Sequence, residues 1–303
     1  MRLTLPWRKQ NLNFNHLDIL VTGANGQLGS EIKRIVSTGS TDTFTFVDIA
    51  EMDLSSDAAI IQFFATKHFD FIINCAAYTA VDKAEEEATL AYRVNSDAVK
   101  VIAEICRDKK IRLIHVSTDY VFDGNGNQPI KPDVVPNPLS VYGKSKLAGE
   151  QHVLDIVHDA YIIRTAWVYS SFGKNFVKTI ARFAKERETL SVVYDQVGSP
   201  TYARDLAVAI LAIIEKIGLG VDQPGIYHYT NEGVISWYDF AVFIVKYYNL
   251  PCKVLAIPSE DYKTVAVRPN FSVLDKRKLK ETFSIEIPHW YESLLECLAE
   301  LPK

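Results

Sequence analysis

Residues 18–32 read "DILVTGANGQLGSEI", an apolar run followed at once by three glycines and a helical pattern. Gly23, Gly26 and Gly29 fall where a strand would turn into a helix. That turn, and the close approach of a backbone to a pyrophosphate, need residues without a Cβ, and the helix N-terminus offers free N–H groups to the anion. The spacing is GxxGxxG rather than GxGxxG. Its place between strand and helix still predicts a dinucleotide-binding loop rather than an ordinary glycine turn.

Asp48 ends the next strand-like run, 19 residues beyond Gly29. An acidic side chain there can accept hydrogen bonds from the adenosine ribose, although a turn-forming aspartate is the simpler reading of this residue taken alone. The carboxylate would also disfavour a 2′-phosphate, and "VDIAEMD" (47–53) contains no Lys or Arg. The chemistry of these residues favours NAD over NADP.

A third strand-like run ends in "NCAAYTAVDKAE" (74–85), whose small residues would let a flat cofactor lie against the backbone. The residues expected to bind the dinucleotide are therefore Gly23, Asn25, Gly26, Gln27, Leu28, Gly29, Asp48, Asp53, Leu54, Ala76, Ala77, Tyr78 and Lys146.

Apolar runs and helical patterns alternate through the first half of the chain. The expected strands are 18–23, 43–48, 69–74, 111–117 and 160–164, and the expected helices are 27–37, 56–67, 86–108 and 141–157. Strands that are apolar almost throughout indicate a sheet covered on both faces, and the alternation predicts a doubly wound parallel sheet. The fold class is α/β, a Rossmann-type sheet with a smaller C-terminal α/β domain for the substrate.

In the second half of the chain, strand-like and helical patterns alternate less regularly. Helices are expected at 174–187, 203–217 and 236–248, with a strand at 190–195. We divide the chain into an N-terminal extension (1–17), a dinucleotide-binding domain (18–169) and a substrate-binding part (170–303) of which some elements return to the main sheet.

The bulk composition excludes several classes of function. The chain has 303 residues, 48% of them hydrophobic, and a net charge of −4 without a long basic block, so neither nucleic acid nor an anionic membrane is indicated. No apolar run is long enough to span a membrane or to act as a signal peptide. The four cysteines lie far apart without a CxxC pair, which argues against a metal cluster or disulfide framework and fits the cytoplasm.

Two stretches in the middle of the chain bring reactive side chains to the expected ligand crevice. "IHVSTDYVF" (114–122) ends the fourth strand with a hydroxyl pair, and "PNPLSVYGKSKLAGEQ" (136–151) begins a helix with Tyr142 and Lys146. At positions i and i+4 these two lie on one helix face, and an ammonium lowers the pKa of a nearby phenol. A Tyr-x-x-x-Lys pair is common by chance. Behind a dinucleotide loop it predicts a proton donor and its tuning residue.

The motifs "TGANGQLG", "STDYVF" and "YGKSK" resemble the extended short-chain dehydrogenase/reductase superfamily. More narrowly, "AAYTAVDKAE", "STDYVFDGNG", "VYGKSKLAGE", "IRTAWVY", "DQVGSPTYARDLA" and "RPNFSVLD" resemble the dTDP-4-dehydrorhamnose reductases, from about residue 18 to residue 300. The resemblance implies reduction of the C4 keto group of dTDP-4-dehydro-L-rhamnose to dTDP-L-rhamnose, for cell-surface polysaccharide.

The resemblance also implies roles for particular residues. Tyr142 would supply the proton, Lys146 would tune the phenol and bind the nicotinamide ribose, and Thr118 would polarise the carbonyl. The residues expected along the dTDP-sugar are Thr118, Asp119, Tyr120, Trp167, Asn175 and Lys178. For Asn175 and Lys178, an ordinary polar helix start is an equal alternative.

Three features refine the implied activity. The related 4,6-dehydratases carry Thr-Asp-Glu at the strand end, whereas Tyr120 stands here in place of the glutamate, so reduction is favoured over dehydration. Some members form Mg²⁺-bridged dimers through glutamates. Glu31 falls at such a position but Arg204 is a cation, so we expect no metal site, while a homodimer remains possible. The family often uses NADPH, which we expect as the cofactor, with NADH also accepted.

Two other functions remain open. The motifs define the chemistry better than the sugar, so the chain could be another nucleotide-sugar 4-ketoreductase. Relatives of this fold also act as non-catalytic, dinucleotide-binding regulatory subunits, such as the β subunit of methionine adenosyltransferase. The intact set of Thr118, Tyr142 and Lys146 weighs against that role.

Overall fold

The computed structural model describes residues 16–302, so all but the last two residues of the expected N-terminal extension lie outside the described part. A six-stranded sheet forms the centre, in the order β10-β5-β4-β3-β1-β2. Every neighbouring pair in it is parallel. Its strands are β1 (Asp18–Thr22), β2 (Thr43–Val47), β3 (Phe71–Asn74), β4 (Arg112–Thr118), β5 (Tyr161–Thr165) and β10 (Gly225–His228).

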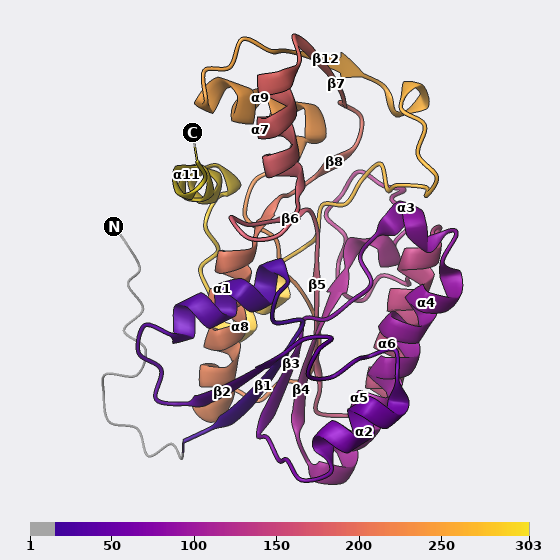
Figure 1. Cartoon of the computed structure of the whole chain (residues 1–303), viewed down its shortest axis with the longest axis vertical. Helices are drawn as coiled ribbons and strands as arrows, with labels where there is room; N and C mark the ends of the chain where they lie inside the picture. The colour runs from indigo at the N-terminus through magenta and orange to yellow at the C-terminus, as the bar shows by residue number, and fades with distance from the viewer. Residues whose placement is uncertain (1–15, 303) are drawn as a thin grey trace.

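Helices cover both faces of this sheet (Figure 1). One face carries α1 (Gln27–Val36), α8 (Ala203–Gly218) and α10 (Arg277–Phe283). The other carries α2 (Asp57–Phe64), α5 (Ala98–Lys109) and α6 (Val141–Ile156). Successive side chains of β1 enter opposite layers, Ile19 and Val21 on one side and Leu20 on the other. Burial on both faces explains the continuous apolar runs in the sequence, and the predicted doubly wound α/β fold is confirmed.

A smaller part stands above the carboxyl ends of the strands (Figure 1). It contains α7 (Phe176–Glu186), α9 (Trp237–Tyr247) and α11 (Trp290–Glu300) around a third apolar core. Its parallel pair is β7 (Thr189–Val193) with β12 (Lys253–Ile257). Short strand pairs complete it: β6 (Val168–Tyr169) with β9 (Thr201–Tyr202), and β8 (Val197–Gly198) with β11 (Ile235–Ser236). Three elements of the second half, β10, α8 and α10, belong to the main sheet and its covering layer.

The predicted helix at 86–108 has an irregular middle. It consists of α4 (Ala88–Tyr92), a π-helical segment Arg93–Asp97 and α5, and it follows a short α3 (Val81–Ala84). In this wider helical turn, the Asn95 side chain contacts both the loop after β3 and helix α6. Its Oδ1 accepts from the Tyr78 amide at 2.8 Å, and its Nδ2 donates to Ser145 Oγ on α6 at 3.1 Å. The π segment thus ties the loop after β3 to the helix that carries Tyr142.

A buried ion pair holds α6 to the sheet. Arg164 on β5 and Glu150 on α6 are almost inaccessible, and Arg164 Nη2 donates to Glu150 Oε2 at 2.6 Å. The guanidinium also lies over the ring of Phe122, 5.0 Å from its centroid. Within residues 16–302, no helix is long and apolar enough to cross a membrane.

Replacing Glu150 by alanine should lower the free energy of unfolding by about 3–5 kcal/mol, because it leaves the buried guanidinium of Arg164 without its counter-charge. Urea unfolding followed by circular dichroism measures the change. Arg107→Ala breaks an exposed pair with Asp108 and serves as the control, with an almost unchanged midpoint expected. Equal losses in the two variants would contradict the importance of the buried pair.

Candidate active site

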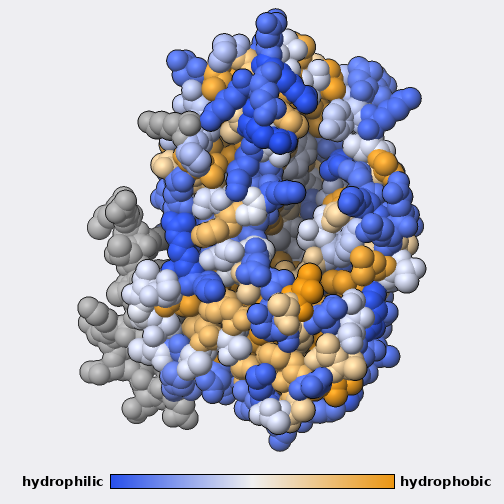
Figure 2. Space-filling model, in the orientation of Figure 1, coloured by the Kyte–Doolittle hydropathy of each residue, from blue (hydrophilic) through white to orange (hydrophobic). Residues whose placement is uncertain are grey.

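A cleft of about 1100 Å³ lies between the main sheet and the smaller part. Figure 2 shows a recess on the face toward the viewer, with hydrophilic residues on both sides. Its floor is formed by the carboxyl ends of β1, β3, β4 and β5, and its far wall includes Trp167, Gln196 and Trp237. Strand ends of a doubly wound sheet are where its ligands bind, so this cleft is the candidate active site.

The glycine loop has the geometry expected for a phosphate-binding turn. Gly23 has φ +65°, and a Cβ on it would lie 2.8 Å from the backbone of Ala76. Gly26 begins α1 without any hydrogen bond from a side chain of the described residues to cap it. The first N–H groups of α1 are thus available to an anion. Gly23, Gly26, Gln27 and Leu28 line the cleft, and so do Ala76, Ala77 and Tyr78 across from them.

Asp48 lies beside this loop at the end of β2. One carboxylate oxygen accepts from the Asn25 amide at 2.8 Å and the other from the Ile49 amide at 2.9 Å. Asp48, Asp53 and Leu54 all line the cleft, whereas Asn25 and Gly29 shape the turn without lining it. The carboxylate stands where it can meet a ribose, but it already stabilises the loop itself.

Thr118 and Tyr142 converge at the end of β4. Gly143 lets α6 come close, since a Cβ there would collide with the Tyr120 carbonyl oxygen. The rings of Tyr120 and Tyr142 meet edge to face, with centroids 5.4 Å apart. Burial raises the pKa of Tyr142, while a hydrogen bond with Thr118 acts in the opposite direction. Tyr142 therefore carries its proton at neutral pH, as a proton donor must.

Lys146 differs from the expectation in one respect. The helical spacing predicted that Lys146 would lower the pKa of Tyr142, yet burial raises that pKa and Lys146 does not contribute to the shift. The Lys146 amine turns instead toward the sheet and donates to the Val116 carbonyl at 2.8 Å. Burial lowers the pKa of Lys146 to about 8, against the raising effects of Glu150 and Cys75. Its side chain still lines the cleft.

The residues expected along the sugar fall into two groups. Asp119, Tyr120 and Trp167 line the cleft, and burial raises the pKa of Asp119 to about 7. Asn175 instead caps α7 and donates to Gln27 Oε1 at 2.9 Å, while Lys178 Nζ donates to the carbonyls of Ser171 and Gly173. Both side chains are engaged in the protein itself and neither lines the cleft, so contact with substrate stays a prediction for them.

Several lining residues have no counterpart in the sequence prediction. Trp237 stacks on Trp167, with ring centroids 3.5 Å apart and planes at 10°. Trp167 has φ +51°, an unfavourable region for a large side chain, so the stacking holds a strained residue in place. Arg268 pairs with Asp82 at 2.6 Å and also lines the cleft. The "RPNFSVLD" motif was a signal for Arg268, but nothing local predicts the Trp–Trp pair.

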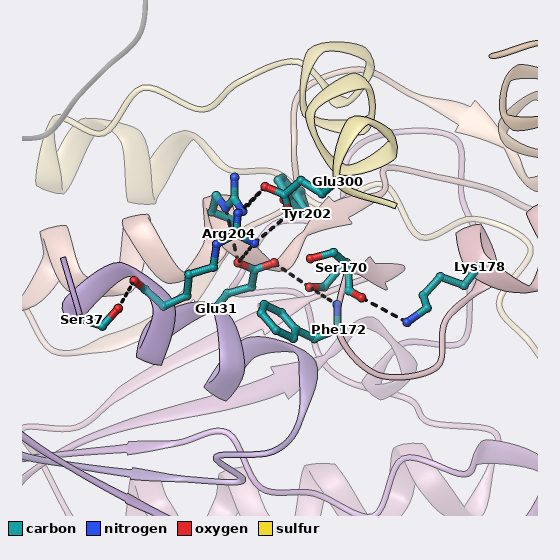
Figure 3. Close-up of polar contacts among 10 residues, drawn as sticks. Glu31, Ser37, Ser170, Phe172, Lys178, Tyr202, Arg204 and Glu300 are labelled. Carbon is teal, nitrogen blue, oxygen red and sulfur yellow. Dashed lines mark hydrogen bonds and ion pairs between the residues drawn. The ribbon is translucent and has the colours of Figure 1, made fainter. Parts of the chain in front are cut away.

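Glu31, Arg204 and Glu300 form a charged cluster that does not line the cleft (Figure 3). Arg204 reaches Glu31 at 3.4 Å and also pairs with Glu300, which Arg34 pairs with as well. Burial alone would raise the pKa of Glu300, but the bonds from Arg34 and Arg204 bring it to about 2. The described residues hold no group of three or more potential metal ligands, and Arg204 puts a positive charge between the two carboxylates.

The RmlD substrate binding domain matches residues 17–302 of the chain. The chain belongs to this family. It is 40% identical over 284 residues to the dTDP-4-dehydrorhamnose reductase of Aggregatibacter actinomycetemcomitans. This match covers 91% of this chain and 96% of that protein. A dTDP-4-keto-6-deoxy-D-glucose reductase of Streptomyces niveus is 35% identical, covering 91% and 95% respectively.

A solved structure of an RmlD relative shares the fold and carries a cofactor. The dTDP-4-dehydrorhamnose reductase of Bacillus anthracis, in complex with NADP, matches with a TM-score of 0.88 and 36% identity. The match covers 95% of this chain and 100% of that one. The predicted family, fold and enzyme class are confirmed.

Removal of divalent cations should leave the melting temperature of this RmlD protein unchanged, because Arg34 and Arg204 together already neutralise the Glu31 and Glu300 carboxylates. Dialysis against EDTA followed by addition of MgCl₂ tests this in a thermal shift assay. Arg204→Glu is the matched control. It brings three carboxylates together, so its melting temperature should rise with Mg²⁺. A rise in the wild-type protein would contradict the charge argument.

Proposed function

We propose that the chain reduces the C4 keto group of dTDP-4-dehydro-L-rhamnose to dTDP-L-rhamnose with NADPH, and that NADH is also accepted. The observation that carries the proposal is the placement of Thr118, Tyr142 and Lys146 in one cleft with the bare N-terminus of α1. The family and the dTDP-sugar substrates named for its relatives support the choice of substrate.

The residues fit a dinucleotide and a proton-coupled reduction. NADPH, when bound, supplies the hydride for the sugar C4. Tyr142 donates its phenolic proton to the oxygen that develops negative charge, and Thr118 stands beside it to hold that oxygen. The developing phenolate then needs a cation, which Lys146 supplies one helix turn away once it is protonated.

The nucleotide part of the substrate would meet the smaller part of the protein. Among residues 16–302, the cationic side chains that line the cleft are Lys146, Lys174 and Arg268. Lys174 and Arg268 are the natural partners of a diphosphate, so we assign them this role in preference to Lys178. The Trp167–Trp237 pair lines the same cleft and offers it an apolar surface. A homodimer stays a prediction. The four cysteines of the described part are free thiols, which supports the proposal that the protein works in the reducing cytoplasm.

A different sugar is the second candidate. The Streptomyces niveus relative is named as a dTDP-4-keto-6-deoxy-D-glucose reductase, so the same fold is associated with more than one keto sugar. NADPH oxidation with each dTDP-4-keto sugar distinguishes the two, and we expect the higher kcat/KM with dTDP-4-dehydro-L-rhamnose. Tight NADPH binding without turnover of any nucleotide keto sugar would favour a regulatory subunit.

Tyr142→Phe should reduce kcat by about 10²–10⁴-fold, because it removes the proton donor. NADPH affinity, measured by fluorescence titration, should stay close to the wild-type value. Tyr262→Phe removes the same hydroxyl from an exposed tyrosine and is the control. Substantial turnover by Tyr142→Phe would exclude Tyr142 as the donor.

Asp48→Asn should raise the ratio of kcat/KM for NADPH over NADH by about tenfold, since it removes a negative charge that would face a 2′-phosphate. Asparagine is chosen because its side-chain oxygen can still accept from the Asn25 amide, so the bond to the glycine loop is kept while the bond from the Ile49 amide is lost. Steady-state kinetics with both cofactors gives the ratio. An unchanged ratio would show that Asp48 does not face the ribose.

A further inference from the structure

A line of buried polar side chains crosses the sheet and ends at Lys146. Thr22 on β1, Asn74 on β3 and His115 on β4 are paired positions of three neighbouring parallel strands. All are buried, with exposed fractions of 0–1%. Thr22 Oγ1 lies 2.6 Å from Asn74 Oδ1, Asn74 Nδ2 lies 3.0 Å from His115 Nδ1, and His115 Nε2 lies 3.3 Å from Lys146 Nζ. The proposed reaction uses none of the first three residues.

The hydrogen bonds of this line have a definite direction. The Ala76 amide donates to Thr22 Oγ1 at 3.3 Å, so the Thr22 hydroxyl is free to donate onward to Asn74 Oδ1. The 2.6 Å separation of these two oxygens is typical of O–H···O bonds, whereas N–H···O bonds are usually about 2.9–3.0 Å long. The Asn74 amide group therefore presents its N–H to His115 and not its carbonyl oxygen.

The tautomer of His115 follows from that direction. Burial and the neighbouring Lys146 hold the pKa of His115 well below its ordinary value, so the imidazole is neutral. A neutral imidazole has one N–H and one acceptor nitrogen. Because Nδ1 accepts from Asn74, the proton is on Nε2, the nitrogen that faces Lys146.

An ammonium has no lone pair to accept this N–H, but a free amine has one. We propose that His115, held by Asn74 and Thr22 in its Nε2–H form, is a positioning residue that donates to the Lys146 amine and so controls the protonation of the catalytic lysine. The same amine keeps its own donor bond to the Val116 carbonyl at 2.8 Å. The line starts at a backbone amide, which releases no proton, and therefore acts as a fixed donor and not as a proton relay.

The groups around Lys146 oppose one another. Burial lowers its pKa to about 8, while Glu150 on the same helix and Cys75 after β3 raise it. Glu150 is already paired with Arg164, and burial raises the pKa of the Cys75 thiol to about 12, so neither supplies a free anion at neutral pH. Without the opposing N–H of His115, Lys146 would become charged more easily.

Nuclear magnetic resonance of the free protein tests the proposal directly. Selective ¹⁵N labelling of histidine should show the His115 proton on Nε2, and ¹³C labelling of lysine should show the Lys146 Cε signal titrating near pH 8. Loss of a signal in His115→Leu or in Lys146→Arg assigns the two resonances. A proton on Nδ1 of His115 would overturn the proposal.

Three variants test the direction of the line. His115→Leu removes the donor and should raise the Lys146 titration by about one pH unit or more. His115→Gln should titrate like the wild type, because its Oε1 can accept from Asn74 while its amide N–H donates to Lys146. In Asn74→Asp, the carboxylate would accept from His115 Nδ1–H. It would therefore favour the other tautomer of His115 and also raise the pKa of Lys146. Asn74→Asp replaces His115→Leu as the test if His115→Leu does not fold. An unchanged pKa of Lys146 in a folded His115→Leu or Asn74→Asp protein would contradict the proposal.

The catalytic consequence rests on the proposed function and has its own readout. The alkaline limb of kcat/KM should move to higher pH in His115→Leu and stay in place in His115→Gln, because the charged lysine is lost as the pH rises through its pKa. If no sugar is turned over by the wild type, the proposed function fails and the resonance experiment alone decides the role of His115. If both variants turn over the sugar and the alkaline limb of kcat/KM stays at the wild-type pH in both, His115 does not control the protonation of Lys146.

Discussion

The parallel register of β1, β3 and β4 brings the ends of three strands to one edge of the sheet, and the chemistry of the molecule depends on it. Thr22, Asn74 and His115 are neighbours only because these strands pair residue for residue. The same register puts Gly23 against Ala76, and it places Thr118 within hydrogen-bonding reach of Tyr142 at the start of α6. A shift of one residue in β3 would turn its side chains to the opposite face. It would both separate Asn74 from His115 and displace the cofactor loop.

Much of this arrangement was predictable from the sequence, for a physical reason in each case. Apolar runs such as 111–117 are visible because a strand buried on both faces has no polar side, and β4 (Arg112–Thr118) differs by one residue at each end. The glycine loop was visible because it joins such a run to a helical pattern. Tyr142 and Lys146 were visible as a pair because helical spacing is local.

The features that escaped prediction depend on contacts between distant segments. The π segment at Asn95 reflects bonds to Tyr78 and Ser145, which lie 17 and 50 residues away. The side chain of Lys146 was expected to lower the pKa of Tyr142, and its turn toward Val116 becomes apparent only when β4 lies under α6. Asn175 meets Gln27 across 148 residues, so a polar helix start and the cofactor loop turned out to be one hydrogen-bonded unit.

The position of β10 has a consequence for the order in which this protein is made. β5 pairs with β10, so β5 has no second neighbour until residues 225–228 have left the ribosome. On the face that holds Ile19, Val21 and Ile163, α8 is made before β10 and α10 after it, so the cover of that face is complete only when residues 277–283 have emerged. Long-range parallel pairing is slow, and unpaired edges promote association between chains. The growing chain therefore carries five of the six strands of the sheet, with β5 as an additional unpaired edge until β10 is made, and that edge is where association between chains is most favoured.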